Sequence, residues 1–150
     1  MNIDQVYMSE ALEKAKIAYK KDEVPVGAII VKNGKIIASA YNLKESHHDA
    51  TAHAEILAIQ QACQVLNSPY LLDCDMYVTF EPCMMCTGAI INARLRKVVY
   101  GAADHRFISL ESILLQYRKT EINHTPIFYG GILENQCSQI MTDYFKKKRK

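Results

Sequence analysis

No apolar run in this sequence approaches the ~20 residues that a helix needs to cross a bilayer. The first residues, Met1 to Gln5, also lack the basic region and the apolar core of a signal peptide. There is no internal repeat and no linker, and the only compositionally biased segment is a basic tail at 146–150. These absences predict a protein without a membrane span, and the expected location is the cytoplasm.

Disulfide bonds are not expected, because the five cysteines are an odd number and no export signal is present. Cys63, Cys74 and Cys137 have no second metal-ligating residue at short spacing, so they are interpreted as small buried apolar side chains. Cys83 and Cys86 form a Cys-x-x-Cys pair, which is typical of metal sites and of redox dithiols.

The composition indicates one globular domain over residues 1–150. With 49% hydrophobic and 23% charged residues, the chain can form a core without disulfide or metal staples. The net charge of +2 conceals an asymmetry, because all five residues of the tail are Lys or Arg while the body before it has 13 basic and 16 acidic residues. A polyanion would therefore be attracted by the tail or by a local patch.

Periodicity and turn residues predict an α/β fold. The pair Asn33-Gly34 is the strongest short signal for a hairpin, because a type I′ turn needs positive φ at both positions. Thr51 is the expected N-cap of one helix and Pro82 the expected first residue of another. Helices are predicted over 8–19, 52–66, 82–93, 109–117 and 133–148, and strands over 24–32, 35–41, 76–80 and 97–101, with 125–129 either a fifth strand or a buried extended segment.

This order of elements predicts a three-layer α/β/α architecture, in which a mixed five-stranded sheet carries helices on both faces. The first two strands pair in antiparallel fashion, and the strands from Met76 onward are expected to be parallel, with right-handed crossovers.

His53, Cys83 and Cys86 are candidate ligands of a catalytic zinc ion. Zinc prefers thiolate and imidazole ligands, and a catalytic zinc leaves one position for water. The two cysteines, three residues apart, share one face of a helix, and His53 is expected in the first turn of another helix. The Cys-x-x-Cys pair alone leaves open a redox dithiol, or a structural zinc with a fourth ligand from Cys63, Cys74 or Cys137.

Glu55 completes the predicted site. A carboxylate close to a metal-acidified water can take its proton, whereas a structural zinc has no use for an unligated carboxylate. His-x-Glu followed by Pro-Cys-x-x-Cys is the signature of zinc deaminases, and here the second half follows about 27 residues after Glu55.

Through these residues the chain resembles the tRNA-specific adenosine deaminases of the cytidine deaminase-like superfamily. The resemblance covers nearly the whole length, and it continues in flanking segments at 23–28, 42, 49–55, 77–83, 88–90, 101–102, 123–124, 131–133, 137 and 144–145. It implies hydrolysis of the wobble adenosine of tRNA to inosine with release of ammonia, one Zn²⁺ per chain, and Glu55 as the catalytic proton carrier.

The resemblance also implies roles for residues around the metal. Asn42 would hydrogen-bond the base, Val26 would form a wall beside it, and the backbone at Ala54 and Cys83 would face the reacting centre. Further expected contacts with RNA are Asp104, Arg106, which offers a charge to a phosphate, and Phe145, which is also a candidate for the core together with Tyr144. Homodimers that bind the tRNA anticodon arm with both subunits are implied as well, and the basic tail is a candidate for phosphate contact or for a solvated end.

Two other functions stay open from the sequence. One is a deaminase of the same superfamily that acts on free guanine or cytosine, which the acidic body favours. The other is a non-catalytic RNA-binding module with a structural zinc, which Glu55 argues against.

Overall fold

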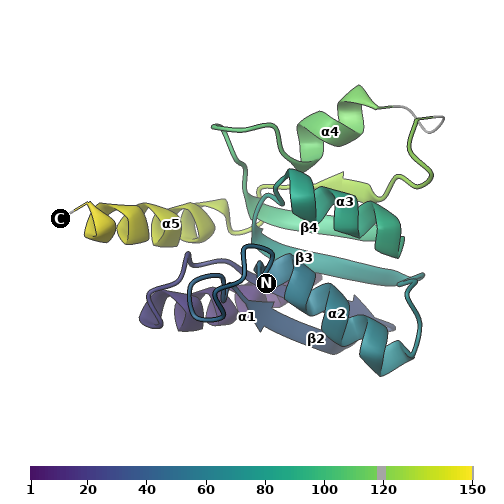
Figure 1. Ribbon diagram of the computed structural model, residues 1–150, viewed down its shortest axis with the longest axis horizontal. Coiled ribbons are helices and arrows are strands. Elements are labelled where there is room, and N and C mark those ends of the chain that lie inside the picture. Colours follow the sequence, from purple (N-terminus) through teal and green to yellow (C-terminus); the bar gives the residue numbers. More distant parts are fainter. Residues whose placement is uncertain (118–120, 150) are drawn as a thin grey trace.

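The computed structural model describes residues 1–117 and 121–149 (Figure 1). This part of the chain forms five helices and five strands. Helix α1 and the β1–β2 hairpin come first, and helices and strands alternate after them. They are α1 (Ile3–Lys20), β1 (Gly27–Lys32), β2 (Lys35–Tyr41), α2 (Ala54–Leu66), β3 (Cys74–Phe80), α3 (Met84–Ala93), β4 (Lys97–Ala102), α4 (Leu110–Gln116), β5 (Ile127–Tyr129) and α5 (Glu134–Lys148). None of these helices is long and apolar enough to cross a membrane.

One mixed sheet has the strand order β2-β1-β3-β4-β5. Strand β1 pairs with β2 and with β3 in antiparallel fashion, whereas β3, β4 and β5 run parallel. The predicted hairpin, the predicted parallel pairing and the fifth strand are therefore confirmed. Asn33 and Gly34 both have positive φ, at 51° and 76°, as the type I′ turn requires.

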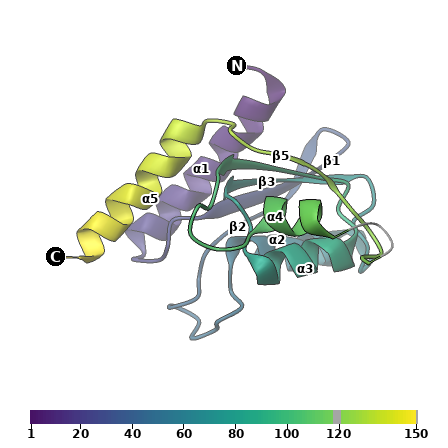
Figure 2. The ribbon, with the colours of Figure 1, turned by 90° about the horizontal axis from the view of Figure 1, so that it is seen from above.

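The sheet lies between two layers of helices, which confirms the three-layer prediction. Helices α1 and α5 cover one face and helices α2 and α3 the other (Figure 2). Helix α1 lies very close to β1, because a Cβ atom at Gly27 would stand 2.1 Å from the carbonyl oxygen of Ala11. Only glycine fits at this contact, which explains the residue inside a strand of otherwise larger side chains.

Three predicted helix starts are wrong by two residues or more. Helix α1 begins at Ile3 and not at Met8, because a capping box of Asn2 and Gln5 starts it before the apolar stripe. The other two lie at the candidate site. Helix α2 begins at Ala54 with His53 as its N-cap, and helix α3 begins at Met84 with Cys83 as its N-cap. Thr51 is not an N-cap, because its backbone N–H and its hydroxyl both donate to the carboxylate of Asp49, at 2.9 and 2.8 Å. Each helix therefore begins two residues later than predicted, after an extended N-cap residue, and Pro82 precedes α3 instead of opening it.

The basic tail belongs mainly to helix α5, whose last turn contains Lys146, Lys147 and Lys148. Lys148 Nζ lies 2.7 Å from Asp22 Oδ2, and Lys147 Nζ lies 3.9 Å from Asp22 Oδ1. Two of the tail's charges are thus directed toward the loop after α1. Residue 150, the end of the predicted tail, lies outside the described residues.

Candidate metal and substrate site

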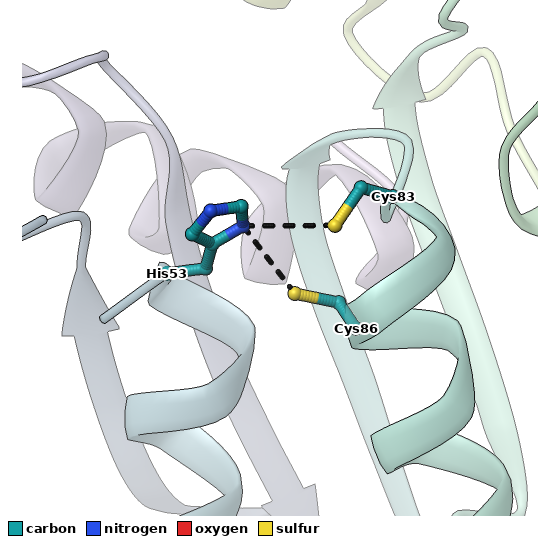
Figure 3. A group of neighbouring side chains, drawn as sticks. All are labelled: His53, Cys83 and Cys86. Atoms are coloured by element: carbon teal, nitrogen blue, oxygen red, sulfur yellow. Dashed lines mark hydrogen bonds between the residues drawn. The ribbon is translucent and has the colours of Figure 1, made fainter. Parts of the chain in front are cut away.

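His53, Cys83 and Cys86 come together at the N-termini of two neighbouring helices (Figure 3). The Nδ1 atom of His53 lies 3.7 Å from Cys83 Sγ and 3.6 Å from Cys86 Sγ. Cys83 follows the carboxyl end of β3, and His53 follows the loop after β2. The carboxyl ends of parallel strands are where open α/β sheets place their ligand sites.

The geometry of this group fits a tetrahedral zinc ion. With Zn–S bonds of about 2.3 Å and Zn–N bonds of about 2.0 Å, tetrahedral ligands stand about 3.5 Å apart from nitrogen to sulfur. The observed separations of 3.7 and 3.6 Å match this value. Because His53 and Cys83 are extended N-cap residues, their side chains project beyond the helix ends and toward each other.

Within residues 1–117 and 121–149, no fourth side chain of the metal-binding types joins the group. Of the other cysteines, Cys74 and Cys137 are fully buried, and Cys63 is partly buried on helix α2. Cys137 packs against Gly101 on the α5 face of the sheet. This arrangement favours three protein ligands over the four of a structural site.

The pKa values of the two thiols of the group shift in opposite directions. Hydrogen bonds from Cys86 and then from His53 lower the pKa of Cys83 to about 4. The pKa of Cys86 is raised, first by its hydrogen bond with Cys83 and then by burial. The pKa of His53 is raised by its hydrogen bond with Cys83. Cys83 is therefore a thiolate at neutral pH, the form that binds metals.

Glu55 lies in the first turn of α2 and is 4% exposed. Burial raises the pKa of its carboxyl to about 7, although neighbouring groups, including His53, oppose this shift. The carboxyl of Glu55 and the thiol of Cys86 each shift the pKa of the other, so Glu55 lies beside the three ligands. The expected convergence of His53 and Glu55 is possible because His53 precedes the helix, so the angular spacing of helical residues does not separate them.

Asn42, Val26 and Ala54 form one connected unit next to His53. The backbone N–H of Asn42 donates to the carbonyl of Val26 at 3.1 Å, and Asn42 Oδ1 accepts from the backbone N–H of Ala54 at 3.1 Å. All three residues are buried. The structure therefore brings together the three residues that the sequence assigned to the base pocket.

Asp104, Arg106 and Phe145 form a second unit, at the carboxyl end of β4. The Arg106 guanidinium lies 3.6 Å from Asp104 Oδ1 and 5.7 Å from the ring centre of Phe145. Together with Phe80 and Arg149 they line a cavity of about 460 Å³. A larger cavity of about 720 Å³ lies between α1 and α5, but none of the candidate site residues lines it.

Two buried carboxylates near the site were not assigned a role from the sequence. Glu23 is 1% exposed and accepts from the backbone N–H groups of Glu45 and Ser46 in the loop before His53. Glu81 is 6% exposed and accepts from the backbone N–H groups of Asp104 and Glu111. The available signal for Glu81 was its position directly after an apolar strand, where a charged side chain needs a partner.

Three comparisons with known proteins agree with this geometry. Residues 2–149 match the family model of the MafB19-like deaminases. A tRNA-specific adenosine deaminase of Rickettsia bellii is 45% identical over 144 residues, which cover 95% of this chain and 99% of that protein.

A solved structure from work on A-to-I editing by tRNA:A34 deaminases at the wobble position is 40% identical, with a TM-score of 0.84, and covers 90% of this chain and 98% of its own. A guanine deaminase from Bacillus subtilis is 42% identical, but it covers only 69% of this chain and 66% of its own, with a TM-score of 0.65.

Proposed function

This chain belongs to the tRNA-specific adenosine deaminase family, and we propose that it hydrolyses the wobble adenosine of a tRNA to inosine with release of ammonia. The observation that carries the proposal is the group of His53, Cys83 and Cys86, whose ligand atoms lie within 4.8 Å of one another, with the buried carboxyl of Glu55 beside them. That combination supplies a metal site together with a proton carrier, which hydrolytic deamination requires.

One Zn²⁺ per chain would be held by the imidazole of His53 and by the thiolates of Cys83 and Cys86. When bound, zinc supplies Lewis acidity that makes a water molecule a competent nucleophile at neutral pH. Two thiolates and a neutral imidazole balance the charge of the ion. The N-termini of α2 and α3 favour the negative charge of the ligands.

Glu55 moves protons in the proposed reaction. Its carboxyl accepts a proton from the attacking water and delivers it to the purine ring nitrogen. It then accepts the second proton, from the hydroxyl group now bound to the reacting carbon, and passes it to the amine, which leaves as ammonia. A carboxyl whose pKa is raised by burial to about 7 can both accept and return protons near neutral pH. Its position in the first turn of α2 keeps it next to Cys86.

Asn42 orients the base in this proposal. Because its Oδ1 atom is engaged by Ala54, its Nδ2 group is left to donate to a ring acceptor of the purine. Val26 bounds the pocket beside Asn42, and the backbone at Ala54 and Cys83 faces the reacting carbon. The adenosine must leave the anticodon loop and enter this pocket to react.

The RNA partner would be the anticodon arm. Arg106 offers a guanidinium to a phosphate, Asp104 supports it, and Phe145 lies beside it on helix α5. Lys146 in the last turn of the same helix and Arg149 at its C-cap add positive charge. We also propose a homodimer, in which one tRNA contacts both subunits, and a cytoplasmic location.

The two alternatives have less support. A free-base deaminase would share the metal chemistry, but the 45% identity to a tRNA-specific enzyme extends over 95% of the chain. A non-catalytic zinc module would leave the buried Glu55 beside the ligands without a role.

The decisive experiment uses a tRNA with adenosine at the wobble position. The purified protein should convert this adenosine to inosine, which is read by sequencing or by nucleoside analysis. A matched tRNA with guanosine at that position serves as the control. Deamination of free guanine with an unchanged tRNA would instead establish the first alternative.

A further inference from the structure

Glu81 links the metal-ligating segment to the loop on the other side of the site. Its carboxylate is buried and accepts from the backbone N–H of Asp104 at 2.9 Å and from the backbone N–H of Glu111 at 2.8 Å. Its own backbone N–H donates to the carbonyl of Ala102 at 2.8 Å. Two residues further along the chain stands Cys83, the N-cap of α3.

The contact with Glu111 caps helix α4 from outside. Ser109 is the N-cap of this helix, but its side chain makes no capping hydrogen bond. The hydroxyl of Ser109 donates instead to Asp104 Oδ2 at 3.2 Å. Glu81 therefore places its negative charge beside the backbone N–H of Glu111, which has no acceptor within the helix. A negative charge at this end of a helix interacts favourably with the helix dipole.

The contact with Asp104 holds the loop at 103–109. Because the Asp104 backbone is fixed by Glu81, its side chain is positioned to accept from the backbone N–H of Arg106 at 2.9 Å and from Ser109. The Arg106 guanidinium then lies against Asp104 and Phe145. The position of this cation over the cavity thus depends on a chain of hydrogen bonds that begins at Glu81.

We propose that Glu81 is a positioning residue that fixes the 103–109 loop, and with it Arg106, relative to the metal-ligating Cys83 segment. It makes no hydrogen bond with the three ligands or with Glu55, so its effect is expected on the binding of the RNA and not on the chemical step. This inference rests on the proposed function for its substrate. The hydrogen-bonding role of Glu81 in the free protein does not depend on it.

The test compares Glu81→Gln with Asp75→Asn. A glutamine offers one oxygen and one NH₂ group to two N–H donors, so one of the two contacts is lost. Asp75 is a matched control, because it is also buried and accepts two N–H groups, from Arg96 at 2.9 and 2.8 Å, but at the opposite end of β3. The measurements are kcat and KM on tRNA, zinc content, and amide hydrogen exchange in the absence of RNA.

For Glu81→Gln we expect KM to rise about tenfold and kcat to stay within about threefold of the wild-type value. This result indicates that substrate and transition state have lost the same binding energy. Zinc content should be unchanged, and at least one of the amides of Asp104 and Glu111, the one that loses its acceptor, should exchange faster. Asp75→Asn should change neither kinetic constant by more than about twofold and should leave both amides protected. If Glu81→Gln does not fold, Glu81→Asp, which keeps the charge but reaches less far, should show the same changes in smaller size.

Three results would overturn the proposal: a fall in kcat at constant KM, a loss of zinc, or equal effects of the Glu81 and Asp75 substitutions. Unchanged exchange at Asp104 and Glu111 would overturn it without any substrate. If the wild-type protein does not deaminate tRNA, the proposed function fails, and the exchange rates alone then decide whether Glu81 holds the loop.

Discussion

The side-chain oxygen of Asn42 accepts a hydrogen bond from the backbone N–H of Ala54 at 3.1 Å. Ala54 is the first residue of helix α2, and His53 before it is the N-cap, whose side chain makes no capping hydrogen bond. Asn42 thus replaces the missing cap, while the imidazole of His53 is directed at the two thiols. One polar side chain supports the helix and also faces the base in the proposed reaction.

The two roles of Asn42 can be separated by substitution. Asn42→Asp keeps an acceptor for Ala54 but lacks the Nδ2 donor, so kcat/KM should fall ten- to hundredfold, about 1.5–3 kcal/mol, with little loss of stability. Asn42→Ala should lose the same activity and also about 1 kcal/mol of unfolding free energy. Kinetics on tRNA and urea unfolding provide the two measurements. Equal stability of the two variants would contradict the capping role.

Glu55→Gln should abolish deamination while leaving the fold and the zinc content intact. Glutamine has nearly the same shape but cannot carry the proton, a loss that costs at least a hundredfold in rate for general acid–base catalysis. Glu55→Ala should behave in the same way. Inosine formation is measured alongside zinc content, and Glu10→Gln on the exposed side of α1 serves as the control. Retained turnover in Glu55→Gln would remove this residue from the mechanism.

Removal of the metal should abolish activity reversibly. The protein should contain about one zinc per chain, chelation should inactivate it, and added Zn²⁺ should restore it. Because ligand binding stabilises the folded state, the chelated protein should also melt at a lower temperature.

The number of sulfur ligands distinguishes this site from a structural zinc. Cys86→Ala should lose the metal, whereas Cys63→Ala, on the same helix as Glu55, should keep it. X-ray absorption should show two sulfur neighbours. Three or more would place another cysteine on the metal and contradict the catalytic assignment.

Substitution of Arg106 should weaken tRNA binding without changing the chemistry. The logarithm of the tRNA association constant falls linearly with the logarithm of the salt concentration. Because Arg106→Gln removes one cation, the steepness of this fall should be smaller by about 1. Arg94→Gln is a matched control, because Arg94 also lies over an aromatic ring, at 5.4 Å from the centre of Tyr70, but at the far end of α3. Titrations at several salt concentrations provide the measurement, and equal slopes for the two variants would exclude Arg106 from the phosphate contacts.

The sequence predicted most of the fold because its signals are local. Apolar periodicity and the Asn33-Gly34 turn are properties of short segments, and the order of elements that follows from them is confirmed by the sheet. The starts of α2 and α3 were predicted two residues too early, because Thr51 was assumed to be the N-cap of α2 and Pro82 the first residue of α3. Thr51 instead donates two hydrogen bonds to Asp49. Such local bonds compete with capping, and the helix preferences of single residues do not reveal them.

The sequence indicates the candidate metal ligands and the proton carrier, but not the buried residues that hold the surrounding loops in place. Residue types and spacing suffice to nominate His53, Glu55, Cys83 and Cys86. The partners of Glu81 lie 23 and 30 residues away along the chain, so no pattern in its neighbourhood could indicate them. Such contacts exist only once β3 and β4 are paired.

The distant caps described above also bear on the order in which the protein folds. Asn42 caps α2 across 12 residues, and Glu81 caps α4 across 30. Both caps form only when segments distant in the chain have come together, and His53 is 30 and 33 residues from the two thiols. We therefore expect refolding rates that do not depend on zinc concentration, with Ala54 and Glu111 protected later than the central strands in pulsed hydrogen exchange. Capture of the metal is then the last event of folding and not its nucleus.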